Sequence, residues 1–165
     1  MADKTIAERL QPSLLDRLTD HNREASTESR DDRVIDVRRM RDIIHRDLSW
    51  LLNANNSETL MDAELYPHSL RSVLNYGVRE VSGDYNTRER AGQMRAAIIR
   101  AIEDFEPRIK RGTINVTLHS EDKGPLSVVV FDIRADMWAQ PMPMELYLRS
   151  HVDITTGEVN LERKG

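Results

Sequence analysis

Two long segments of the chain place hydrophobic residues three and four positions apart, which is the spacing of one face of an α-helix. In residues 34–52 this face consists of Val37, Met40, Ile44, Leu48 and Leu51. In residues 87–105 it consists of Ala91, Met94, Ile98, Ala101, Ile102 and Phe105. We therefore predict two amphipathic helices. Asp32 is expected to cap the first, and Pro107 to end the second, because proline disfavours helical geometry at the residue before it.

Beyond Gly112 the hydrophobic residues recur at every second position, as in a half-buried β-strand. The first such strand has Ile114, Val116 and Leu118 on one side. Three further strands are expected at residues 127–137, 145–154 and 158–161, the last two joined by a tight turn at Thr155-Thr156-Gly157. Helices followed by antiparallel strands predict an α+β fold, in which two main helices pack on a sheet of about four strands. The pattern leaves the order of the strands open.

Two short helices are expected outside these main elements. The first covers residues 13–18, with Ser13 as its N-cap. The second covers residues 69–76 and ends at Gly77, because glycine readily adopts the left-handed backbone that terminates helices. Residues 19–33 are almost entirely polar and predict a linker without a core of its own. We therefore expect a helical N-terminal arm and linker at residues 1–33 and a single α+β domain at residues 34–165.

Composition excludes several classes of function. The chain has 165 residues, a net charge of −4 and no cysteine, so it has no disulfide framework, thiolate zinc site or cysteine nucleophile. Its first ten residues carry charges and lack the apolar run of a signal peptide, which predicts a cytoplasmic protein. We also find no glycine-rich phosphate loop and no metal-binding histidine spacing, so no cofactor and no metal are expected.

Two functional alternatives remain open at this point. Carboxylates are plentiful, and a peptidoglycan glycosidase needs only two of them about 5–9.5 Å apart, one with a raised pKa. Glu103, Asp104 and Glu106 cluster at a helix end, however, rather than in an inferred cleft. Residues 88–111 hold 7 basic and 4 acidic side chains, which makes a nucleic-acid-binding helix the weaker alternative. Its cations would be Arg88, Arg90, Arg95 and Arg100.

The segment Glu106-Pro107-Arg108 departs from an electrostatic rule. Anions at a helix C-terminus are disfavoured by about 0.3–1 kcal/mol, and chains tend to break such rules at functional or strained sites. One interpretation is a local surface ion pair. The other is a partner-binding site, in which Pro107 rigidly presents Glu106 and Arg108 on the same side. On that view both side chains are exposed, and replacing either by alanine leaves the fold intact.

Several stretches, in order along the chain, resemble one family, the TssE-type baseplate subunits of type VI secretion systems. They are Ser13–Leu18, Arg46–Asn53, Tyr66–Leu70, Val73–Gly77, Phe105–Ile109 and the turn Thr155–Gly157. That family belongs to the phage-tail baseplate-wedge group once labelled lysozyme-like. The label itself implies no activity here, because no catalytic pair stands out in the sequence.

The resemblance implies a non-enzymatic, cytoplasmic wedge subunit whose partners are TssF, TssG and TssK. It implies that the motif formed by Glu106, Pro107 and Arg108 contacts the core bundle of the wedge. It also implies that the C-terminal sheet is similar to the strand-exchanging part of the sheath subunits TssB and TssC. An exposed edge of that sheet would then help to initiate the contractile sheath, since an unpaired edge can accept a partner strand.

Overall fold

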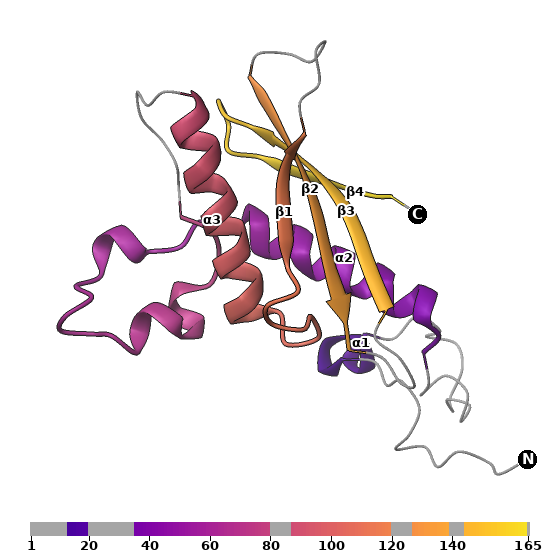
Figure 1. Ribbon diagram of the computed structural model, residues 1–165. Helices are drawn as coiled ribbons and strands as arrows, with labels where there is room; N and C mark the ends of the chain where they lie inside the picture. Colours follow the sequence, from indigo (N-terminus) through magenta and orange to yellow (C-terminus); the bar gives the residue numbers. More distant parts are fainter. Residues whose placement is uncertain (1–12, 20–34, 80–86, 120–126, 139–143, 165) are drawn as a thin grey trace, which may run out of the picture.

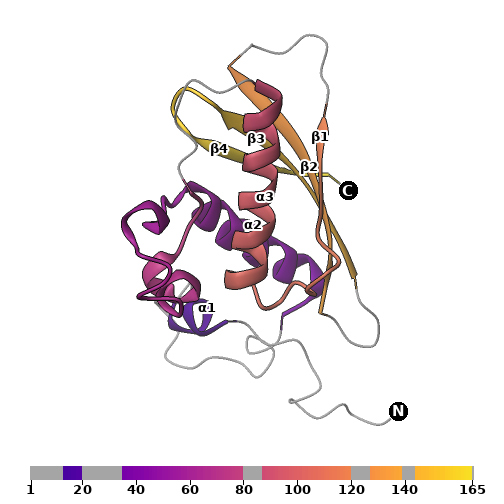
Figure 2. The same cartoon turned by 60° about the vertical axis from the view of Figure 1, so that its left-hand side comes forward.

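The fold is a four-stranded antiparallel sheet with two long helices on one face, as Figures 1 and 2 show. The computed structural model describes residues 13–19, 35–79, 87–119, 127–138 and 144–164. The long helices are α2 (Val37–Asn53) and α3 (Thr87–Phe105). The strands are β1 (Asn115–His119), β2 (Val128–Met137), β3 (Met144–Asp153) and β4 (Val159–Arg163). The predicted α+β class is confirmed.

Helix α2 begins three residues later than the periodicity predicts. Its N-cap is Asp36, whose carboxylate accepts a hydrogen bond from the Arg39 backbone N–H at 2.7 Å. The sequence prediction of Asp32 as the cap is therefore wrong. Both residues are good caps by type, and Met40, in the first turn after Asp36, is the first buried residue of α2.

Helix α3 has the predicted bounds. It ends at Phe105, one residue before the position that Pro107 excludes from helix. The Glu106 N–H still donates to the Ile102 carbonyl at 2.9 Å. Pro107 therefore ends the helix while the last turn keeps its backbone hydrogen bond. The chain then turns towards β1.

The strands form a simple meander in the order β1-β2-β3-β4. The β2–β3 hairpin is the longest pairing, from Val128 opposite Asp153 to Met137 opposite Met144. Strand β1 follows the predicted alternation only in part. Val116 is fully buried, but Leu118 on the same side is 54% exposed. An edge strand has a neighbour on one side only, so its terminal side chains receive less cover.

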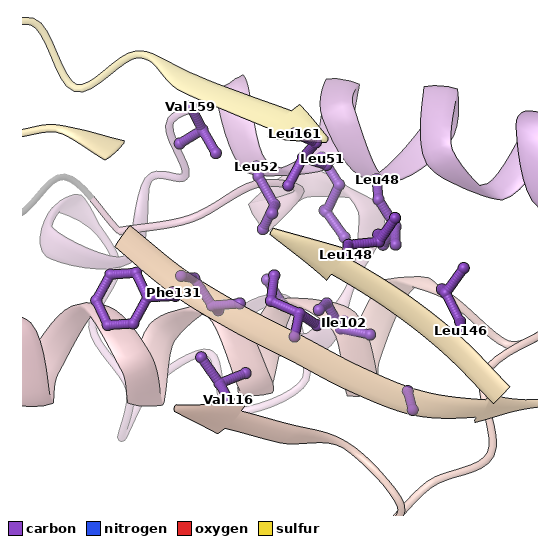
Figure 3. Close-up of a cluster of buried hydrophobic side chains, with 14 of the residues drawn as sticks. Leu48, Leu51, Leu52, Ile102, Val116, Phe131, Leu146, Leu148, Val159 and Leu161 are labelled. Carbon is purple, nitrogen blue, oxygen red and sulfur yellow. The ribbon is translucent and has the colours of Figure 1, made fainter. Parts of the chain in front are cut away.

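The core lies between the sheet and the two helices. Helix α2 packs on the β4 side of the sheet and α3 on the β1 side, and Figure 3 shows side chains from both helices meeting those of the strands. The side chains labelled there are Leu48, Leu51, Leu52, Ile102, Val116, Phe131, Leu146, Leu148, Val159 and Leu161. The other face of the sheet is polar, and Arg149 of β3 donates to Asp132 of β2 at 2.8 Å across it.

Residues 58–75 form three single 3₁₀ turns, η3 (Glu58–Leu60), η4 (Ser69–Arg71) and η5 (Val73–Asn75), instead of one short helix at 69–76. The predicted helix breaks at Ser72, which has an extended backbone and caps η5 by accepting from the Leu74 N–H. The predicted helix stop at Gly77 is likewise not found, because η5 ends at Asn75 and its C-cap is Tyr76. Gly77 has φ +121°, and a Cβ there would lie 2.2 Å from the Ala54 carbonyl oxygen.

The described residues of the arm form a helix, α1 (Leu14–Leu18), capped as predicted by Ser13. It lies near the C-terminal end of α3 in both views (Figures 1 and 2). The predicted linker lies, apart from Thr19, outside the described residues. No helix within the described ranges combines the length and the apolar character needed to cross a membrane.

A buried polar side chain of the core has no hydrogen-bond partner within the described residues, which allows a test of the packing. Ser150 of β3 is fully buried, and its hydroxyl has no hydrogen-bond partner. We expect Ser150→Ala to leave the free energy of unfolding unchanged or to raise it by about 1 kcal/mol, because an unpaired buried hydroxyl is destabilising. The neighbouring inward residue Leu148 is the control, and Leu148→Ala should lower stability by about 2–5 kcal/mol. Urea unfolding measures both, and a clear loss in Ser150→Ala would contradict this account.

Candidate functional site: a charged corner at the end of helix α3

The predicted site residues lie where α1, α2 and the end of α3 meet. Five charged side chains form a continuous chain of ion pairs there, which we call the corner network. Its members are Asp16, Arg46, Asp47, Glu106 and Arg108. They come from segments up to 92 positions apart in the sequence. The network therefore joins the arm to both long helices.

Glu106 lies inside this corner rather than on its surface. The residue is only 4% exposed. Its carboxylate accepts hydrogen bonds from the Arg108 backbone N–H at 3.1 Å and from Arg108 Nε at 2.7 Å, and its other oxygen accepts from Arg108 Nη2. The expectation that Glu106 stands exposed beside Arg108 is therefore wrong. The local ion pair of the first interpretation is present, in a buried form, and partner binding by the motif stays a prediction.

Arg108 connects this carboxylate to helix α2. Its Nη2 donates to Asp47 Oδ2 at 2.6 Å while the same guanidinium holds Glu106. Burial alone would lower the pKa of Arg108, but the hydrogen bonds and negative charges of Glu106 and Asp47 outweigh it and raise that pKa further. The Arg108 side chain keeps 25% of its surface exposed, and Pro107 beside it is exposed. These two residues form the outward part of the motif.

The arm joins the network through Arg46 of α2. Arg46 donates from Nε and Nη2 to Asp47 at 2.9 and 2.7 Å, and from Nη1 to Asp16 of α1 at 2.6 Å. The Asp16 side chain is only 4% exposed. The hydrogen bond that Arg46 donates to Asp16 raises the pKa of the Arg46 guanidinium. Sequence reasoning missed Arg46, Asp47 and Asp16, because no local pattern relates residues so far apart.

Aromatic side chains surround the network. Tyr76 packs edge-on against Phe105 with ring centroids 5.3 Å apart. Burial, together with the charges of Asp47 and Glu106, raises the pKa of the Tyr76 hydroxyl. On the outer side the Arg46 guanidinium lies over the Trp50 ring, 4.9 Å from its centroid, and Trp50 is 53% exposed. The corner thus has a closed polar interior and a partly apolar rim.

This arrangement is suited to holding elements together and to binding, rather than to proton transfer. Three carboxylates face two guanidiniums, so each cation is shared by two carboxylates, each carboxylate has at least one cation beside it, and the five charges sum to −1. Within the described ranges, no three histidine, aspartate or glutamate side chains gather closely enough to hold a metal ion.

The other candidate residues are used within the fold. Arg90 donates to the Ile154 carbonyl at 2.9 Å, Arg95 to the Val116 carbonyl at 2.5 Å and Arg100 to Glu58 at 3.0 Å. They connect α3 to the sheet and to the 3₁₀ segment and do not form one basic stripe. The side chain of Arg88 lies outside the described residues.

The comparison with known families gives the class of protein, a structural protein of the phage-baseplate type. Residues 38–142 match the model of the family described as baseplate wedge protein gp25. The chain belongs to this family. The matched region runs from α2 to the segment after β2 and includes Asp47, Glu106 and Arg108. No curated protein and no solved structure matches the chain.

Breaking the corner network should cost stability, in contrast to the expectation for an exposed motif. Glu106→Ala leaves Arg108 without its main buried partner, so we expect the free energy of unfolding to fall by about 3 kcal/mol. The control is the ion pair between Arg71 and Asp104, whose atoms are 3.9 Å apart and whose arginine side chain is 81% exposed. Arg71→Ala should cost less than about 1 kcal/mol. Equal losses in the two variants, measured by urea unfolding, would contradict the assignment.

The attachment of the arm to α2 should depend on pH only under acidic conditions. Burial alone would raise the pKa of the Asp16 carboxyl, but hydrogen bonds from Arg46 and Ser13 and nearby positive charges hold it below its usual 3.8. A lowered pKa means that the contact is stable above the unfolded value of about 3.9 and is lost as pH falls through the folded value. We expect the Asp16 carboxyl carbon to titrate below 3.8 by NMR, and at higher pH in Arg46→Gln. A wild-type midpoint above 3.8 would contradict this.

Proposed function

We propose that the protein is the TssE-type structural subunit of a type VI secretion baseplate wedge, acting in the cytoplasm by binding other subunits. Membership of the baseplate wedge family supports a structural role in a phage-tail-like assembly. The Glu106-Pro107-Arg108 motif carries the finer assignment, because it lies at the end of α3 with the other TssE-like stretches in order around it. Two of those stretches supply α1 and the Arg46-Asp47 pair of the corner network.

In this proposal the three residues of the motif have different roles at the interface with TssF, TssG and TssK. Glu106 is a positioning residue, because both of its oxygens are occupied by Arg108. Pro107 and the exposed part of Arg108 are the groups that face a partner. A guanidinium already held by two carboxylates loses little further side-chain entropy on binding, which favours a specific contact.

The sheet supports the second half of the proposal, contact with the sheath subunits TssB and TssC. Its two edges are β1 and β4, each of five residues. Strand β4 pairs with β3 only between Leu148 and Val152. Short edges limit self-association, yet they offer unpaired backbone groups to an incoming strand.

We propose no catalytic activity. A lysozyme-like mechanism needs a carboxyl group with a raised pKa to act as the acid. Within the described part of the chain, the carboxyl groups with shifted values are Asp16, Asp132 and Asp153, and each has a lowered pKa. The cause at Asp132 is first the hydrogen bond from Arg149, and at Asp153 the backbone N–H groups of Thr155 and Thr156. Each is thus stabilised as an anion.

Co-purification with the wedge subunits tests this proposal. Wild-type protein should retain TssF, TssG and TssK, while Arg108→Lys should retain them about tenfold less, since lysine preserves the charge but not the two-pronged donor geometry. Arg111→Lys, in the same loop, is the matched control and should behave as wild type, because Arg111 is exposed and its side chain donates to the Glu103 carbonyl rather than to a carboxylate. Failure of the wild type to retain the partners, or muramidase activity of the pure protein, would overturn the assignment.

A further inference from the structure

Helix α1 has an inverted distribution of polar and apolar side chains. An amphipathic helix on a domain surface normally buries its leucines and exposes its acids. In α1 the Asp16 side chain is 4% exposed. By contrast, Leu14 is 72% exposed, Leu15 47% and Leu18 74%. We call these three leucines the arm-helix surface.

The inversion has a physical cause in the corner network. A five-residue helix does not persist in water without further contacts. Here the Ser13 cap holds its first turn, and the ion pair between Asp16 and Arg46 attaches it to α2. The attachment uses the polar side of the helix, so the leucines are left on the side away from α2.

The segment that follows α1 in the sequence is polar, and residues 1–12, which include Ile6 and Leu10, lie outside the described residues. Residues 20–33 contain a single alanine and otherwise only polar and charged residues. The nearest exposed apolar side chain linked to α1 through the network is Trp50, under the Arg46 guanidinium. The arm-helix surface and Trp50 therefore form an apolar rim around a polar centre, which is the composition of a docking site.

We propose that α1 inserts its three leucines into an apolar groove of a neighbouring wedge subunit. This inference rests on the proposed function and names a further contact of the same corner. Arg17 is exposed and has no ion-pair partner within the described residues. It lies between the leucines in sequence, so the groove should carry a carboxylate at its rim.

The size of the surface favours this occupant over a second copy of the chain. An exposed leucine side chain presents about 100 Å² of apolar area, so the three offer about 200 Å² at their observed exposures. A symmetric dimer through this surface would bury about 400 Å², well below the roughly 1,200–2,000 Å² of a stable interface. The surface suffices as one part of a larger heteromeric interface, in which a short helix lies in a groove.

The test compares two double variants of the full chain in binding to the purified complex of TssF and TssG. Leu14→Ser with Leu18→Ser should weaken binding by at least about tenfold. The control, Leu60→Ser with Leu65→Ser, alters equally exposed leucines of the 3₁₀ segment, at 86% and 70%, and should remain within about twofold of wild type. Both melting temperatures should stay at the wild-type value, because all four side chains are exposed.

Two single variants separate attachment from contact. Asp16→Asn keeps all three leucines in the sequence but removes the charge that attaches α1 to Arg46. Binding should therefore weaken although no apolar side chain is changed. Arg17→Glu should slow association, most strongly at low salt, because it reverses the charge facing the proposed carboxylate.

The outcomes distinguish this inference from the proposed function. If wild-type protein does not bind the TssF–TssG complex, the proposed function fails. If it binds and the Leu14→Ser, Leu18→Ser variant binds equally well, only the role of α1 is overturned. Equal weakening in the control pair would also overturn it. So would a leucine-dependent dimer in size-exclusion chromatography or leucine-dependent sedimentation with phosphatidylglycerol vesicles, because either assigns the surface to another occupant.

Discussion

The geometry of the corner depends on one guanidinium shared by two carboxylates. Arg108 holds Glu106, two residues before it, and Asp47, on the other long helix. Neither acid is fully exposed, so removing the arginine would leave two partly buried negative charges close together, which is strongly unfavourable. The two ion pairs of Arg108 therefore fix how the end of α3 meets α2. Because Asp47 also pairs with Arg46, and Arg46 with Asp16, the same contacts fix the position of the arm.

The ion pair between Arg108 and Glu106 explains why an acid is tolerated at the end of α3. The helix dipole disfavours an anion there by at most about 1 kcal/mol. Three hydrogen bonds from Arg108 to the Glu106 carboxylate outweigh that term. Pro107 contributes by ending the helix at Phe105, which leaves the Arg108 backbone N–H free to bind Glu106 instead of continuing the helix.

Periodicity predicted the elements well because each is decided by its own burial pattern. The bounds of α3 and the four strands follow from apolar residues at helical or alternating spacing. The corner network was not predictable in this way. Glu106 is a charged residue beside a turn, where exposure is the usual outcome, and Asp47, which shares Arg108 with it, lies 59 positions earlier. The 3₁₀ turns at 69–75 were missed because the Ser72 hydroxyl competes with the helix for backbone N–H groups.

The arm is attached to its own domain by an ion pair, whereas its proposed contact with a neighbouring subunit is apolar. An ion pair within a corner orients a helix but contributes little apolar burial, so it leaves the leucines of α1 accessible. An arm that buried these leucines in its own domain would be more firmly attached, yet it would have no apolar surface for a neighbour. In a helix of five residues only one side can face α2. Because the Asp16 side faces α2 and pairs with Arg46, Asp16 is buried and the leucines on the other side are exposed.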